Sequence, residues 1–116
     1  MTSRWHITRG VGELTLSRQL PARFDVVAST TLPMGDPLRL AHQIRQDLWR
    51  ALQGVRGFSP VLRLTQDGEM IRVEAGGRVA MPVPRGLADR ISDVLDHPAR
   101  RQRWVTQARR SARGFA

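Results

Sequence analysis

Apolar side chains recur at helical spacing in the middle of the chain, where Leu40, Ile44 and Leu48 are separated by four residues each. This pattern predicts a helix over Asp36–Gly54. The aspartate is a good N-cap, Pro37 suits the first turn, and the closing glycine can end the helix. Such a stripe must be buried, so the other segments are expected to form a surface that covers it.

Alternation of apolar and polar residues predicts β-strands on both sides of this helix. The predicted strands are Trp5–Arg9, Glu13–Ser17, Phe24–Thr31, a strand defined by Leu62 and Leu64, Met70–Ala75, and a short edge strand Arg78–Val83 that contains Pro82. Asp67 and Gly68 predict a type I′ hairpin turn, which needs positive φ at both central residues. Gly76 and Gly77 predict a second tight turn before the edge strand.

Two further helices are predicted near the C-terminus. Apolar residues at Leu87, Ile91 and Leu95 mark the first of them. It ends before Pro98, because the residue that precedes a proline is disfavoured in the α region. We expect the last helix to begin at Pro98 and to run to about Ser111 or Ala112.

These elements predict an α+β fold: a mostly antiparallel sheet of about five strands with two helices packed on one face. Residues 1–97 would form a single domain, and residues 98–116 a basic helix that docks on this domain or extends from it. Leu40 and Ile44 also align with Leu87 and Ile91 at a constant offset. This offset indicates either two strand–strand–helix pseudo-repeats or only the patterning that buried faces share.

The composition excludes several classes of chemistry. The chain has 116 residues, 41% of them hydrophobic, and can bury a core without staples. It lacks cysteine, lysine and tyrosine, which excludes disulfides, thiolate nucleophiles, Schiff bases and phenolic acids. It has no apolar run of about 18 residues and no secretory signal. We therefore expect a cytoplasmic protein, whose arginine bias is typical of a bacterial, G+C-rich genome.

The net charge of +9 is concentrated at the two chain ends. Residues 1–24 contribute +3, residues 25–96 are neutral, and residues 97–116 contribute +6 without any acid. This asymmetry is typical of a basic interaction segment on an ordinary scaffold. The central helix exposes Arg39, His42 and Arg45, but because its region is neutral we expect it mainly to support the sheet.

No catalytic residue, metal site or cofactor is assigned, and a non-enzymatic protein is favoured. His6, His42 and His97 come from different elements and lack the spacing of metal ligands. Asp93 and His97 are four residues apart, and an enzyme that used them would need a cavity around both. We interpret His97 more simply, as a contact to carbonyls at the end of the second helix.

The segment from Pro98 to Phe115 combines an apolar face with a face of arginines. Trp104 lies on the apolar side and is expected to dock the helix, whereas Arg101 intrudes on that side. The candidate binding residues are Arg100, Arg103, Arg109, Arg110 and Arg113.

Three interpretations of this segment remain open. Its arginines are only solvated, or they contact the phosphate backbone of RNA or DNA, or they bind an anionic protein or membrane surface. The favoured hypothesis is a small non-enzymatic module that contacts nucleic-acid backbone. The alternative is an accessory or assembly subunit that docks on an acidic partner protein. Arg4, Trp5 and Arg9 would join the surface if the N-terminus lay nearby.

Overall fold

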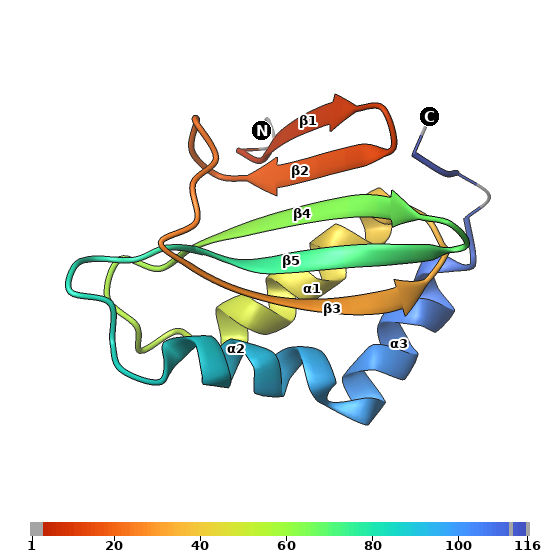
Figure 1. The fold of residues 1–116 in the computed structure, drawn as a ribbon. Helices are drawn as coiled ribbons and strands as arrows, with labels where there is room; N and C mark the ends of the chain where they lie inside the picture. The colour runs from red at the N-terminus through yellow and green to blue at the C-terminus, as the bar shows by residue number, and fades with distance from the viewer. Residues whose placement is uncertain (1–3, 112, 116) are drawn as a thin grey trace.

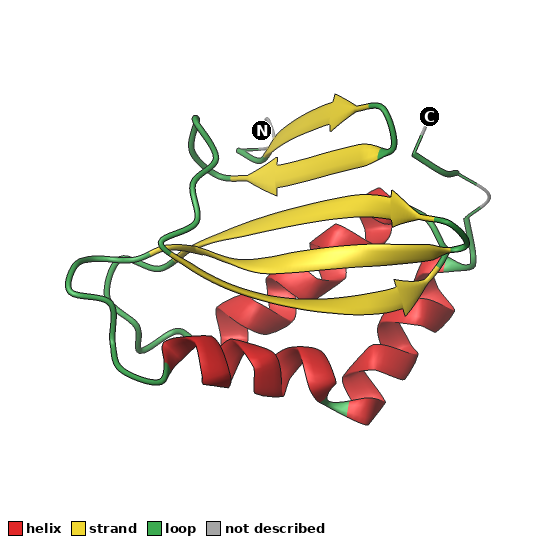
Figure 2. Cartoon of the chain, in the orientation of Figure 1, coloured by secondary structure: helices red, strands yellow, loops and turns green. Residues whose placement is uncertain are grey.

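The computed structural model describes residues 4–111 and 113–115, which form a five-stranded sheet with three helices against one face (Figure 1). The strands are β1 (His6–Gly10), β2 (Glu13–Ser17), β3 (Val26–Pro33), β4 (Ser59–Asp67) and β5 (Met70–Arg78), and the helices are α1 (Pro37–Ala51), α2 (Leu87–Asp96) and α3 (Pro98–Ala108). The α+β prediction is confirmed. The third helix shares the covered face with the other two, and the opposite face is open (Figure 2).

The sheet order is β1-β2-β4-β5-β3, and every pair of neighbours is antiparallel. The β4–β5 hairpin therefore lies between β2 and β3. Strands β2 and β3 do not pair with each other. The first predicted strand–strand–helix unit therefore has no equivalent of the β4–β5 hairpin.

The period of two in the strands separates a buried face from a polar one. Leu14, Leu64 and Val73 are opposite one another on β2, β4 and β5, and all three are fully buried. One position along, Arg63 and Glu74 are partners on the open face, where their charged groups lie 3.8 Å apart. The core thus lies between the sheet and the helices, as the alternating pattern requires.

The turn between β4 and β5 has two central residues, Gly68 and Glu69, and joins the partners Asp67 and Met70. Among the described residues only glycines have positive φ, and Gly68 has φ of 60°. The hairpin prediction is confirmed, but the turn has positive φ only at its first central residue, as in type II′ rather than type I′.

The predicted turn at Gly76 and Gly77 is wrong. Strand β5 continues through both glycines to Arg78, and residues 79–86 connect it to α2 instead of forming an edge strand. A Cβ on Gly76 would lie 1.9 Å from the carbonyl oxygen of Val26, and one on Gly77 would lie 2.0 Å from that of Ser59. The two glycines allow close approach of the neighbouring strands.

The start of α1 agrees with the prediction. The Asp36 carboxylate accepts hydrogen bonds from the backbone N–H groups of Leu38 (3.0 Å) and Arg39 (3.3 Å). The helix ends at Ala51, earlier than predicted, and the left-handed backbone occurs at Gly57, with φ of 70°. There the chain folds against the segment after β5, where the Ala80 N–H donates to the Arg56 carbonyl.

His97 separates α2 from α3 and caps the second of them. Its Nδ1 accepts a hydrogen bond from the Arg100 N–H at 3.3 Å. The expected contact to an α2 carbonyl is made by the backbone N–H of His97, which donates to the Val94 carbonyl at 3.4 Å. Helix α3 ends at Ala108, short of the predicted Ser111 or Ala112, the latter of which lies outside the described residues. The Ala108 carbonyl accepts from the Asp36 N–H at 2.9 Å, which joins the end of α3 to the start of α1.

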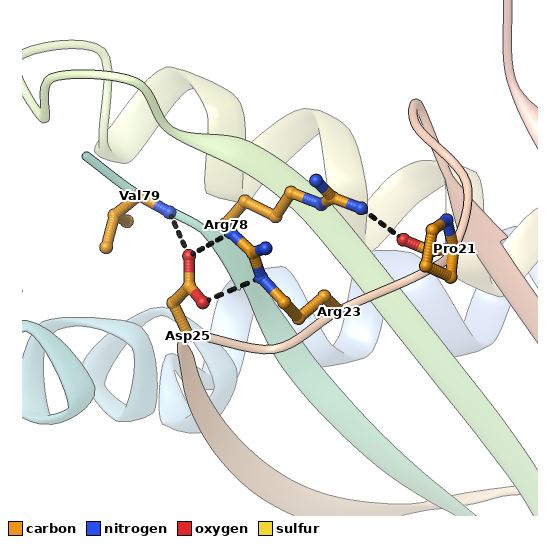
Figure 3. A network of polar contacts seen from close by, with 5 residues as sticks. All are labelled: Pro21, Arg23, Asp25, Arg78 and Val79. Carbon is orange, nitrogen blue, oxygen red and sulfur yellow. Dashed lines mark hydrogen bonds and ion pairs between the residues drawn. The ribbon is translucent and has the colours of Figure 1, made fainter. Parts of the chain in front are cut away.

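A polar network fixes the connection between β2 and β3 to the end of β5 (Figure 3). Asp25 accepts hydrogen bonds from the Arg23 side chain and from the Val79 N–H, each at 3.0 Å, and Arg78 donates to the Pro21 carbonyl. The Arg23 hydrogen bonds, followed by that from Val79, lower the pKa of Asp25 below its ordinary 3.8. The role of this network is structural, because it joins these two segments and pairs Arg23 with Asp25.

Candidate anion-binding surface

The five arginines predicted to bind an anion do not lie together. Arg100 is in the first turn of α3, whereas Arg109 caps the end of the helix and Arg110 and Arg113 follow it. An 11-residue helix is about 16 Å long, which separates Arg100 from the other group. Arg109, Arg110 and Arg113 are exposed at the end of the molecule where α1 begins.

Arg103 already has an internal partner. Its guanidinium donates to the carboxylate of Asp47 on α1, and the same carboxylate oxygen accepts the indole N–H of Trp104 at 2.7 Å. Trp104 is fully buried, so the prediction that it docks the helix is confirmed. The Arg103 charge therefore joins α3 to α1 and is less available to an external phosphate than the other four.

Arg101, the basic residue on the apolar side of α3, anchors the helix to the sheet. Its guanidinium donates to the Thr30 hydroxyl (2.7 Å), the Thr31 carbonyl (2.8 Å) and the Leu95 carbonyl (3.1 Å). Strand β3 is an edge of the sheet, so the Thr31 carbonyl lacks a neighbouring strand on that side. The Arg101 guanidinium, on the apolar side of α3, thus supplies hydrogen-bond donors to the open edge of the sheet.

The two basic chain ends meet. Arg9 of β1 and Arg113 of the C-terminal segment line one cavity of about 280 Å³ with Asp36, Leu38 and Gly114. Figure 1 shows the C-terminal segment beside the turn of the β1–β2 hairpin. The sequence could not place these segments relative to each other, and the structure places Arg9 and Arg113 in the wall of the same cavity.

A second, more open hollow of about 560 Å³ adjoins this cavity and shares Asp36, Leu38 and Arg113 with it. Its other lining residues are Arg39, His42, Gln43 and Ser111. Among the residues that the structure describes, Asp36 is the only carboxylate that lines either hollow, and it is 6% exposed and accepts N–H groups of α1. We call the surface formed by Arg9, Arg39 and Arg113 the end cleft.

A third cavity, of about 300 Å³, lies where the N-terminal segment meets α1 and the start of β4. Its lining residues are Trp5, Arg18, Arg45, Trp49, Phe58, Ser59 and Pro60, and we call it the indole pocket. The guanidinium carbons of Arg45 and Arg18 lie 4.7 and 5.5 Å from the centre of the Trp5 ring. Within the described parts of the chain, neither arginine forms an ion pair with a carboxylate.

The surroundings of Arg45 in the indole pocket disfavour its charge. Burial, and then the positive charge of Arg18, lower the pKa of Arg45 below its ordinary value. Arg45 donates to Nδ1 of His42 at 3.2 Å, and its own Nε is buried without an acceptor in the structure. Burial, and then Arg45, lower the pKa of His42, which favours a neutral ring that accepts this hydrogen bond.

Sequence reasoning missed the indole pocket. Arg45 and Trp49 are four residues apart on α1, which was a usable signal, but the neutral charge of residues 25–96 argued against a binding face there. The neutral net charge of residues 25–96 is misleading, because several acids of this region form contacts away from the indole pocket. Asp36 caps α1, and Asp47 accepts a hydrogen bond from α3. Arg18 and Trp5 come from another segment, and only the fold places them beside α1.

The comparisons with known proteins are negative. The sequence matches no protein-family model, and searches of curated proteins and solved structures gave no significant match. Arguments about function therefore depend on the geometry alone.

Other types of site have less support. Across residues 4–111 and 113–115, no three His, Cys, Asp or Glu side chains converge to hold a metal ion, and no helix is long and apolar enough to cross a membrane. Neither Asp93 nor His97 lines the three cavities described above. The concave surfaces that do exist are basic and partly aromatic, which suits anions.

Proposed function

We propose that this protein is a non-enzymatic module that binds the phosphate backbone of a nucleic acid through the end cleft and the adjoining Arg109 and Arg110. The observation that carries the proposal is the convergence of Arg9 and Arg113 on one cavity. These residues belong to the two segments that hold the whole excess of positive charge. Their juxtaposition makes one basic surface from two basic chain ends.

The chemistry of the cleft favours phosphate. Guanidinium groups donate in a planar fork that matches phosphate oxygens, and neutralised phosphates release counterions. The Asp36 carboxylate in the cleft is buried in a helix cap, so it competes little for these arginines. Backbone contacts of this kind give affinity without strong sequence preference.

The test is the salt dependence of binding to a labelled oligonucleotide, followed by fluorescence anisotropy. Five arginines on duplex DNA predict a slope of log affinity against log salt of about −4 to −5. Replacing Arg9, Arg39 and Arg113 with alanine should reduce the magnitude of this slope by about 3. A matched variant with alanine at Arg56, Arg72 and Arg85 loses the same charge outside the three cavities and should keep the slope.

Two results would contradict the proposal. One is no binding to RNA or DNA at low salt, and the other is an equal loss in both triple variants, which would indicate only a diffuse charge effect. Purification with and without nuclease tests the alternative. An acidic protein that stays bound in stoichiometric amount after nuclease treatment, and is released by the end-cleft variant, would favour a docking subunit instead.

A further inference from the structure

The indole pocket holds two cations, Arg18 and Arg45, and neither forms an ion pair with a carboxylate of the residues that the structure describes. Arg18 and Arg45 both lie over the Trp5 ring, and burial, followed by the charge of Arg18, lowers the pKa of Arg45. Arg45 Nε is also buried and has no acceptor among the described residues. An anionic oxygen between the two guanidiniums would offset their positive charge and accept hydrogen bonds from them.

The same pocket offers an apolar, flat surface beside these cations. Trp49 lies one helical turn after Arg45 and is 45% exposed, which is a large solvent-facing area for an indole. Phe58 and Pro60 form another part of the wall. A ligand that fits must therefore combine an anionic group with a planar apolar group.

Size and position narrow the ligand further. A volume of about 300 Å³ is at the lower limit of pockets for small organic molecules, which suits one nucleotide unit rather than a longer ligand. His42 lines the end cleft and accepts from Arg45 of the indole pocket, so the two sites adjoin. Arg39 of the end cleft and Trp49 of the indole pocket are both on α1, about 15 Å apart along the helix axis.

We propose that the indole pocket binds an unpaired nucleotide, with its base against Trp49 and its phosphate between Arg18 and Arg45. This inference rests on the proposed nucleic-acid binding and specifies single strands as the preferred ligand. A base within a duplex is stacked and paired, so it cannot enter the pocket without disruption of the helix. Stacking of exposed bases on aromatic side chains, beside a basic track, is a general mode of single-strand binding.

The experiment measures Kd for a labelled single strand and for the duplex of the same sequence, with wild-type protein and two pocket variants. Trp49→Leu removes the stacking surface, and Arg18→Gln removes one of the two cations of the pocket. Each should weaken single-strand binding about 5- to 100-fold and leave duplex binding within about twofold. Arg56→Gln serves as the control for a lost charge and should change neither constant.

The source of the nucleotide is tested with adenosine and uridine monophosphate and with inorganic phosphate, by quenching of indole fluorescence. Quenching by the mononucleotides that is lost in Trp49→Leu supports base binding. If mononucleotides bind in this way but no oligonucleotide does, the pocket inference stands for free nucleotides and the proposed backbone function fails.

Two outcomes would overturn the inference. One is a ratio of single-strand to duplex affinity that neither Trp49→Leu nor Arg18→Gln changes while circular dichroism shows both variants folded. The other is equal competition by phosphate and by mononucleotides, which would leave only a phosphate site. Loss of duplex binding in the end-cleft variant alone would still support the backbone function in both cases.

Discussion

The carboxylate of Asp47 on α1 accepts a hydrogen bond from the indole nitrogen of Trp104 on α3, at 2.7 Å. The indole is fully buried and Asp47 is 6% exposed, so a water molecule cannot take the place of either hydrogen-bonding partner unless the structure rearranges. This contact fixes α3 across α1. It also explains why the C-terminal helix is part of the fold rather than a free arm.

Asp47→Ala should lower the free energy of unfolding by about 1–3 kcal/mol, because the buried indole N–H loses its acceptor. Asp47→Asn should cost less, since the amide oxygen can still accept that hydrogen bond. Urea unfolding followed by circular dichroism measures both values. The control is Asp93→Ala, an exposed residue on α2. Equal stability of Asp47→Ala and the control would show that the contact contributes nothing.

Arg101→Ala should destabilise the protein by about 1.5–3 kcal/mol, because a charged donor to Thr30, Thr31 and Leu95 is lost. Arg100→Ala, at the neighbouring position, should change stability by no more than about 0.5 kcal/mol. Thermal unfolding of the two variants gives the comparison. A larger loss for Arg100→Ala would reverse the roles assigned to these arginines.

Gly76→Ala should prevent correct pairing of β3 with β5, since the added Cβ would meet the Val26 carbonyl oxygen at 1.9 Å. We expect a loss of more than about 4 kcal/mol, which is exceptional for one substitution. Gly54→Ala is the matched control, because its Cβ would have no neighbour within 4 Å. The control should be neutral or slightly stabilising, by at most about 1 kcal/mol. Expression level and melting temperature report the difference.

His42 should titrate below its ordinary pKa of 6.5, because burial and the charge of Arg45 disfavour its protonated form. The unfolded chain then binds more protons than the folded one, so stability is full above about pH 6.5 and falls as the pH decreases toward the folded pKa. An NMR titration of the His42 ring measures the pKa, and His42→Gln should flatten this part of the pH–stability curve. His6→Gln is the control.

A bound anion in the indole pocket should move the His42 pKa upward, because it offsets the charge of Arg45. The same NMR titration in the presence of a mononucleotide measures this shift. An unchanged or lower pKa with saturating nucleotide would contradict the placement of its phosphate beside Arg45.

Local signals were sufficient for most elements. The Asp36 cap, the Leu40–Leu48 stripe and the break before Pro98 depend on neighbours within a few residues, and the structure contains all three. The failed predictions depend on distant neighbours. Gly76 lies where β3 approaches β5 too closely for a side chain. Helix α3 ends at Ala108, whose carbonyl accepts a hydrogen bond from the Asp36 N–H.

Some features of the candidate site could be predicted from the sequence, and others depend on the fold. The concentration of charge at the chain ends and the role of Trp104 as a docking residue followed from composition and periodicity alone. Only the fold decided that Arg103 is held by Asp47, and that Arg9 lies with Arg113. It also decided that Arg18 joins Arg45 around Trp5.

The sequence by itself determined the helices, the alternating strands and the excess of positive charge, because hydrophobic periodicity and charge are properties of short segments. The tertiary structure decided which charges are paired and which remain free, because that depends on contacts between residues far apart in the chain. The strand order places the N-terminal hairpin next to β4 and within reach of α1. From that placement come the end cleft and the indole pocket.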